Sequence, residues 1–99
     1  MEQHDQDMPL PEPSLLTLVS GLAAQAMMSL GIFPNPIDGQ TRILLHQGKH
    51  FIDTIAVLFE KTSGNLTPEE TQTFENILHE LRVIYVAAQN EKSKRETEN

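Results

Sequence analysis

The chain has 99 residues, of which 38% are hydrophobic and 21% are charged, and this length suits one domain and excludes a second. It contains no cysteine, which excludes disulfides, zinc ribbons and thiol nucleophiles. Its 14 Asp and Glu residues outnumber its seven Lys and Arg residues, so the formal net charge is −7. Nucleic acid is disfavoured as a partner, because a negatively charged protein would repel backbone phosphates.

The beginning of the chain has the composition of a tail. Acidic and amide residues are combined there with Pro9, Pro11 and Pro13, which lack backbone donors and disfavour helix in the residues before them. We expect residues 1–13 to be disordered. The acidic start also lacks the positively charged region and apolar stretch of a secretory signal. Together with the absence of cysteine, this favours a cytoplasmic protein.

The first predicted helix covers about residues 14–30, with Ser14 as its N-cap and Gly31 in the left-handed position that follows a helix. At 100° per residue, apolar side chains converge on one face. They are Leu15, Val19, Leu22, Ala23, Ala26 and Leu30. The opposite face is small and neutral, and no charged residue occurs between Pro13 and Phe33.

A helix that faces water on one side normally carries charged residues there, so we expect this helix to be covered on both sides. A core of about 75 residues rarely supplies more than ~3–5 kcal/mol of net stability without disulfides, metal or oligomerisation. The sequence therefore favours a homo-oligomer, with a dimer as the first expectation. Its expected interface consists of Leu18, Ser20, Gly21, Ala24, Gln25 and Met28.

Two alternatives explain the same uncharged helix. One is a three-helix monomer that exposes a neutral strip. The other is association with a membrane through residues 15–33, whose length is close to the ~20 residues needed to span a bilayer. Polar residues inside this stretch and the absence of basic flanks make the membrane alternative the weaker one.

A proline-rich connector with an Asp38-Gly39 turn follows, and we expect its apolar residues Ile32, Phe33 and Ile37 to lie over the core. The second helix is expected from about Leu45 to Thr62. Its start lacks an obvious polar cap, which leaves two possibilities. Either Thr41 caps the helix early, or residues 43–45 run extended along a neighbouring element.

The third helix has the clearest start. Thr67 and Glu70 form a capping box around Pro68, which loses nothing at the first helical position by lacking an amide. Apolar residues at spacings of three and four then predict a helix to about Ala88. The short link before it makes the second and third helices an antiparallel hairpin. We expect one all-α, three-helix domain over residues 14–89 and a disordered charged tail over residues 90–99.

One set of side chains on the second helix could bind metal. His46, His50 and Asp53 lie at i, i+4 and i+7, and two imidazoles one turn apart can share an ion. The ordinary explanation is a polar helix face in which Lys49 and Asp53 form an i, i+4 ion pair. We favour that explanation and expect no metal and no cofactor.

Asp53 and Arg82 are expected to face each other across the hairpin, with Tyr85 one turn beyond. Such a pair would hold the two helices in register, as a structural feature and not a catalytic one, because it offers no nucleophile and no suitable base. Known catalytic motifs are absent from the sequence. We therefore expect a non-catalytic, self-associating interaction module, with a metal-binding protein or small metalloenzyme, or a membrane-associated protein, as alternatives.

Five blocks of the sequence, in order and spacing, resemble the short bacterial proteins grouped as domain of unknown function 1844. The blocks are Ala24–Gly31, Pro34–Pro36, His50–Thr54, Glu60–Thr67 and Leu78–Arg82 with Tyr85. The resemblance covers about residues 15–86. It implies a compact helical bacterial protein and brings no established activity, so it assigns no catalytic residue.

Overall fold

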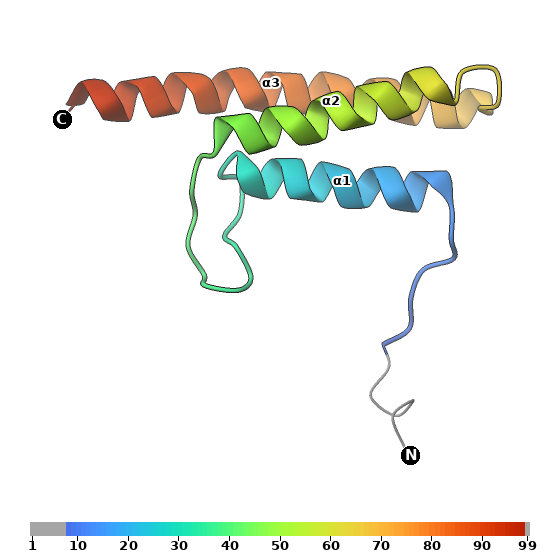
Figure 1. Cartoon of the computed structure of the whole chain (residues 1–99), viewed down its shortest axis with the longest axis horizontal. Coiled ribbons are helices and arrows are strands. Elements are labelled where there is room, and N and C mark those ends of the chain that lie inside the picture. Colours follow the sequence, from blue (N-terminus) through green and yellow to red (C-terminus); the bar gives the residue numbers. More distant parts are fainter. Residues whose placement is uncertain (1–7, 99) are drawn as a thin grey trace, which may run out of the picture.

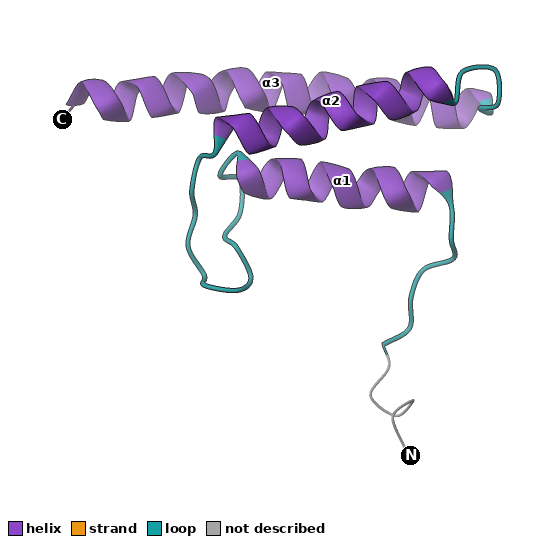
Figure 2. Ribbon diagram, in the orientation of Figure 1, coloured by secondary structure: helices purple, strands orange, loops and turns teal. Residues whose placement is uncertain are grey.

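The structure, a computed structural model, describes residues 8–98 of the chain. It consists of three α-helices: α1 (Leu15–Ser29), α2 (Leu45–Lys61) and α3 (Pro68–Glu98) (Figure 1). Consecutive helices run in opposite directions, and no strand occurs in the described part of the chain (Figure 2). The predicted all-α, three-helix fold is confirmed. Residues 8–13, within the predicted tail, form no helix, and residues 1–7 of that tail lie outside the described residues.

Both predicted ends of α1 are confirmed. The Ser14 hydroxyl accepts a hydrogen bond from the Thr17 N–H at 3.0 Å, which satisfies one of the amides left unpaired at a helix start. At the other end, Gly31 has φ +83°, and its N–H donates to the Met28 carbonyl at 3.1 Å. The Ile32 N–H donates to the Met27 carbonyl at 2.9 Å, which completes a Schellman motif.

The start of α2 depends on its neighbours. Leu44 is the N-cap, and it has no side chain that can accept a hydrogen bond. Its N–H donates instead to the Ser29 carbonyl at 2.7 Å, and the Ile43 carbonyl accepts from the Lys92 ammonium at 3.0 Å. The expectation of an early cap at Thr41 is therefore wrong. Residues 43 and 44 run along the end of α1, as the second possibility predicted.

The capping box of α3 is confirmed. The Thr67 hydroxyl accepts from the Glu70 N–H at 3.0 Å, and the Glu70 carboxylate accepts from the Thr67 N–H at 2.9 Å. The other end differs from the sequence prediction, because α3 continues beyond Ala88 to Glu98. Residues 90–98, predicted to be a disordered tail, are helical.

Two interactions support this extension of α3. Glu91 and Arg95 form an i, i+4 ion pair at 3.0 Å, which stabilises a helix directly. The Lys92 ammonium is held on the Ile43 carbonyl, which ties the extension to the connector between α1 and α2. Residues 90–98 contain no apolar side chain that could pack on the core, which is why the sequence predicts disorder there. The hydrogen bond from Lys92 to a backbone carbonyl holds this part of the helix in place of apolar packing.

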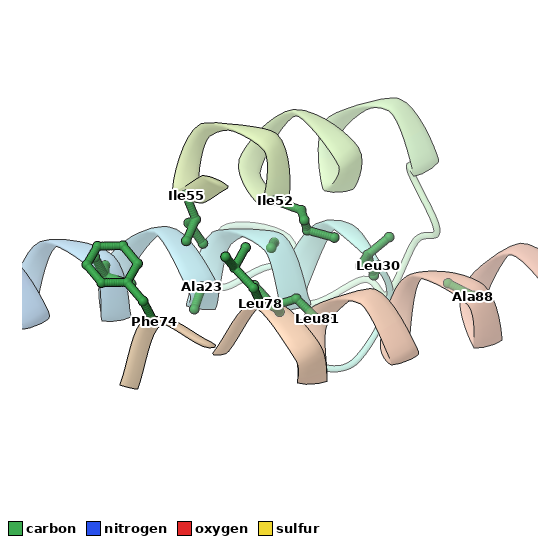
Figure 3. Close-up of a cluster of buried hydrophobic side chains, with 10 residues drawn as sticks. Ala23, Leu30, Ile52, Ile55, Phe74, Leu78, Leu81 and Ala88 are labelled. Atoms are coloured by element: carbon green, nitrogen blue, oxygen red, sulfur yellow. The ribbon is translucent and has the colours of Figure 1, made fainter. Parts of the chain in front are cut away.

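The core lies where the three helices meet, and side chains from all three point toward one another there (Figure 3). α1 contributes the face predicted from its periodicity, and the Phe59 and Phe74 rings stack with centroids 4.9 Å apart. Each large side chain that is fully buried stabilises the fold by about 1.5–3 kcal/mol. The buried apolar residues are Val19, Ala23, Ala26, Leu30, Ile52, Ile55, Phe74, Leu78, Leu81 and Ala88.

α1 and α2 approach most closely at Gly48. A Cβ placed on this residue would lie 2.6 Å from the Cγ atom of Leu30, which is only 2% exposed. Gly48 is therefore required by packing, because the side chain of Leu30 occupies the space that any larger residue would need.

The connector between α1 and α2 projects from the helices as a loop (Figure 1). Its predicted Asp-Gly turn is present, with the Gly39 N–H bonded to the Asn35 carbonyl at 2.7 Å. Ile32, Phe33 and Ile37 are exposed, Ile37 to 92%, so the expectation that they cover the core is wrong. The junction between the two helices directs this segment outward, away from the core.

Two glycine-to-alanine substitutions should have opposite effects on stability. Gly48→Ala should lower the free energy of unfolding, because overpacking against Leu30 costs ~1–3 kcal/mol and exceeds the ~1 kcal/mol gained in helix propensity. Gly21→Ala should raise it by about 1 kcal/mol, since no atom lies within 4 Å of the added methyl group. Urea denaturation at low protein concentration measures both, and stabilisation by Gly48→Ala would contradict the packing shown here.

Candidate functional site

The predicted interface residues lie on the outward side of α1, and the described part of the chain leaves this side uncovered. Leu18 is 53% exposed, Ser20, Gly21 and Gln25 are exposed, and Ala24 and Met28 are half-buried. No atom lies within 4 Å of where a side chain on Gly21 would begin. No charged residue occurs from Ser14 to Ile37. We call this surface, defined by Leu18, Ser20, Gly21, Ala24, Gln25 and Met28, the neutral face.

The neutral face continues into a depression of about 370 Å³ beside α2, which we call the loop depression. Gln25, Met28 and Ser29 of α1 form one wall, and the connector and the beginning of α2 form the others. Arg42 is the only charged residue among those that line it. The lining from the connector and α2 consists of Asn35, Pro36, Ile37, Gln40, Arg42, Leu44, Gln47 and Phe51.

The positive charge of Arg42 is balanced by the neighbouring carboxylate of Asp38. Their ion pair measures 2.6 Å, and the same guanidinium nitrogen donates to the Gln40 side chain at 2.8 Å. The hydrogen bond from Arg42 lowers the pKa of Asp38 below its ordinary value, and the Gln40 N–H lowers it further. The rim of the loop depression is therefore neutral overall.

A second hollow, also about 370 Å³, lies at the end of α1, between that end and α3. We call it the α3 groove. Sequence reasoning missed it, because its far wall includes Glu91 and Arg95 from the part of α3 predicted to be disordered. The available signal was the pair of apolar residues Val83 and Ala87, which fall outside the predicted core face of that helix and line the groove. The groove is lined by Leu30, Gly31, Ile32, Ile43, Val83, Ile84, Ala87, Ala88, Glu91 and Arg95.

The candidate metal ligands His46, His50 and Asp53 all belong to α2 and are exposed. Asp53 accepts a hydrogen bond from the Lys49 ammonium at 2.7 Å, which confirms the ion pair predicted as the ordinary explanation. This bond and the charge of Asp53 raise the pKa of Lys49. Over residues 8–98, no group of three or more His, Asp or Glu side chains is placed to hold a metal ion.

Asp53, Arg82 and Tyr85 do come together, as predicted, in one shallow depression between α2 and α3. The expected bridge between Asp53 and Arg82 is wrong, however, because these two described residues form no ion pair within 4.0 Å. Lys49 lies one turn away on the same helix and reaches the carboxylate without crossing between helices. The Phe59 and Phe74 rings, one from each helix, stack across the hairpin.

Among the described helices, none is long and apolar enough to cross a membrane. α1 has 15 residues, fewer than the ~20 that a span needs.

Comparison with models of protein families gives a match. A family model described as Domain of unknown function (DUF1844) matches residues 12–87. The chain belongs to this family. The DUF1844 match begins two residues before Ser14 and ends one residue before Ala88, so it contains α1, α2 and the first two thirds of α3. No match was found among curated proteins or among solved structures.

Titration can test whether Arg42 lowers the pKa of Asp38 at the loop depression. Arg42→Gln should return the pKa of Asp38 toward its ordinary value, because the guanidinium that favours the carboxylate is lost. The lowered pKa means that the pair stabilises the connector above the ordinary Asp pKa and that this stabilisation disappears as the pH falls through the folded-state pKa. Carboxyl-carbon NMR follows the titration. Lys49→Gln is the control and should leave Asp38 unchanged, whereas an unchanged Asp38 in Arg42→Gln would contradict the assignment.

Proposed function

We propose that this protein is a non-catalytic interaction module of the cytoplasm that self-associates through the neutral face of α1. The observation that carries the proposal is an exposed helix surface without a charged side chain in a chain whose net charge is −7. Surface helices normally carry Lys, Glu or Arg on the side that faces water.

Charge also distinguishes the neutral face from the other surfaces. Two copies of a chain with a net charge of −7 repel each other, and like charges brought together at an interface cost several kcal/mol. Residues 68–81 of α3 carry four exposed or half-buried carboxylates, Glu69, Glu70, Glu75 and Glu80, and no Lys or Arg. Pairing through the neutral face avoids this repulsion, because neither copy brings a charge to the contact.

The residues of the neutral face suit contact between two helices. Ser20, Gly21 and Ala24 are small and central, since α1 has its midpoint at Leu22. Two helices with small residues at the contact can approach to the 8–10 Å between axes that is typical of packed helices. A two-fold arrangement uses the same patch on both copies. When its axis crosses the helices at right angles, the two α1 helices are antiparallel, and the larger Leu18 and Met28 side chains lie at the edges of the contact.

Two further observations support a non-catalytic module. The loop depression is lined by amide, aliphatic and aromatic side chains and one balanced ion pair, with no arrangement of nucleophile and base. The core is small and contains no cysteine, and chains of this size commonly gain stability through oligomerisation.

One isosteric change should weaken self-association. Gln25→Glu adds a carboxylate to the exposed neutral face of each copy, and in a two-fold dimer each charge loses water in a contact that offers it no cation. We expect the dissociation constant, measured by sedimentation velocity over a concentration series, to rise at least tenfold, which corresponds to ~1.4 kcal/mol.

Gln72→Glu is the matched control, because it makes the same change at an exposed glutamine on the outward side of α3. It should leave the dissociation constant within twofold of that of the unmodified protein, and circular dichroism should show both variants equally helical. A compact monomer at tens of micromolar for the unmodified chain would refute the proposal.

A further inference from the structure

We infer that the loop depression of each copy receives Leu18 from a second copy, so that the connector between α1 and α2 is part of the dimer interface. This inference rests on the proposed self-association and names the site on the partner at which the contact ends. Three observations carry it. They are the small area of the neutral face, the balanced charge of the depression beside it, and the exposure of Leu18.

The neutral face by itself is too small for a stable dimer. α1 has 15 residues and is therefore about 22 Å long, and a helix with its side chains is about 10 Å wide, so the footprint of a second helix on it is roughly 220 Å². Stable interfaces bury about 800 Å² on each partner, and much smaller contacts are typical of crystal packing. A dimer built on the neutral face must therefore extend onto surface that adjoins it.

The loop depression is the adjoining surface that suits this extension. Gln25 and Met28 belong both to the neutral face and to the lining of the depression, so the two surfaces are continuous. The depression adds no net charge, because Asp38 balances Arg42. At the other end of α1, the exposed carboxylate of Glu12 would bring another negative charge to a contact between two acidic chains. The depression therefore favours an uncharged occupant, since a charged one would find no free counter-ion there.

Leu18 is the side chain of the neutral face that gains most from being covered. It is 53% exposed, and it is the one large apolar residue of α1 that is more than half exposed. The depression offers it an apolar floor, because Met28, Leu44 and Phe51 line it and Leu44 is itself 38% exposed. Burial of Leu18 against this floor removes apolar surface of both copies from water, which favours association.

Leu18 cannot fill the depression of its own chain. Leu18 and Met28 belong to the same helix and lie about 15 Å apart along its axis, at 1.5 Å per residue. The helix holds the two side chains at this separation. A leucine at position 18 can therefore enter a loop depression only in another molecule.

The antiparallel arrangement of the two α1 helices brings Leu18 to this site. If Gly21 of one copy faces Ala24 of the other, three residues back on the first helix correspond to three residues forward on the second. Leu18 then lies opposite Met27 and next to Met28, at the mouth of the depression. The axes of two packed helices lie about 8–10 Å apart, which is close enough for these side chains to meet.

The connector is ordered in the way that a wall of a binding site requires. Hydrogen bonds join the Asn35 N–H to the Gln40 carbonyl at 2.8 Å, the Gly39 N–H to the Asn35 carbonyl at 2.7 Å and the Ile37 N–H to the Asn35 side chain at 2.8 Å. The connector projects beyond α1 on the side away from α3 (Figure 1), and Ile37 on it is 92% exposed. A partner helix on the neutral face therefore meets an apolar side chain whose backbone is already fixed, which reduces the entropy lost on binding.

Because the chain contains no cysteine, disulfide trapping tests this contact with single engineered thiols. Thr17→Cys leaves Leu18 in place, and residue 17 is exposed one turn before Gly21 on the same side of α1. This chain is mixed with a Gln47→Cys chain, whose thiol lies in the loop depression, or with Gln72→Cys or Gln89→Cys, which replace exposed glutamines of α3. We expect the mixed disulfide with Gln47→Cys to form at least tenfold faster than with either acceptor on α3. Equal rates, or a faster rate with an acceptor on α3, would overturn the inference.

Sedimentation of two charge variants separates this inference from the proposed function. Gln47→Glu places a carboxylate in the loop depression but outside the neutral face, and Ser20→Glu places one on the neutral face but outside the depression. The carboxylate at position 47 would lose water beneath the partner's leucine, while Arg42 already has Asp38 as its counter-ion. We expect each variant to raise the dissociation constant at least tenfold, with circular dichroism showing both as helical as the unmodified chain.

The two variants distinguish the two failures. If Ser20→Glu weakens association and Gln47→Glu does not, the neutral face stands and the occupied depression is refuted. If Ser20→Glu has no effect, the neutral face is refuted, and the occupied depression, which depends on it, is refuted as well.

Discussion

The contact between Leu30 and Gly48 determines how the rest of the molecule is arranged. Leu30 follows the last turn of α1 and packs where Gly48 has no side chain, while the Leu44 N–H donates to the Ser29 carbonyl. Together these interactions bring the end of α1 against the beginning of α2 and leave the intervening connector to project outward. The two hollows lie on either side of this junction, since Ser29 and Leu44 line the loop depression and Leu30 and Ile43 line the α3 groove.

The extension of α3 beyond Ala88 forms part of the α3 groove. Beyond Ala88 the helix no longer has a core to cover, and it continues through the Glu91–Arg95 pair and the contact of Lys92 with the Ile43 carbonyl. This extension supplies the Glu91 and Arg95 side chains that line the α3 groove. α3 is therefore acidic over residues 69–80, whereas the three acidic and three basic residues between Glu91 and Glu98 balance.

Membership in the DUF1844 family brings no activity with it, so the assignment of function depends on what the surface of this chain can do. The surface is unusual in how its charge is distributed. A chain with twice as many acidic as basic residues keeps one helix and the connector after it uncharged as far as Ile37. That distribution is unfavourable for a solvated helix and favourable for contact with a copy of itself, because self-contact through a charged face would bring like charges together.

The sequence by itself determined the features that depend on interactions within one turn of helix. The Ser14 cap, the glycine after α1, the Thr67–Glu70 capping box, the core stripe of α1 and the neutral face follow from residue types three or four positions apart. Only the tertiary structure decided the start of α2, the extension of α3 and the α3 groove. Each of these depends on which backbone carbonyl or side chain lies within reach in space, and residues as far apart as Ile43 and Lys92 are brought together only when the helices pack.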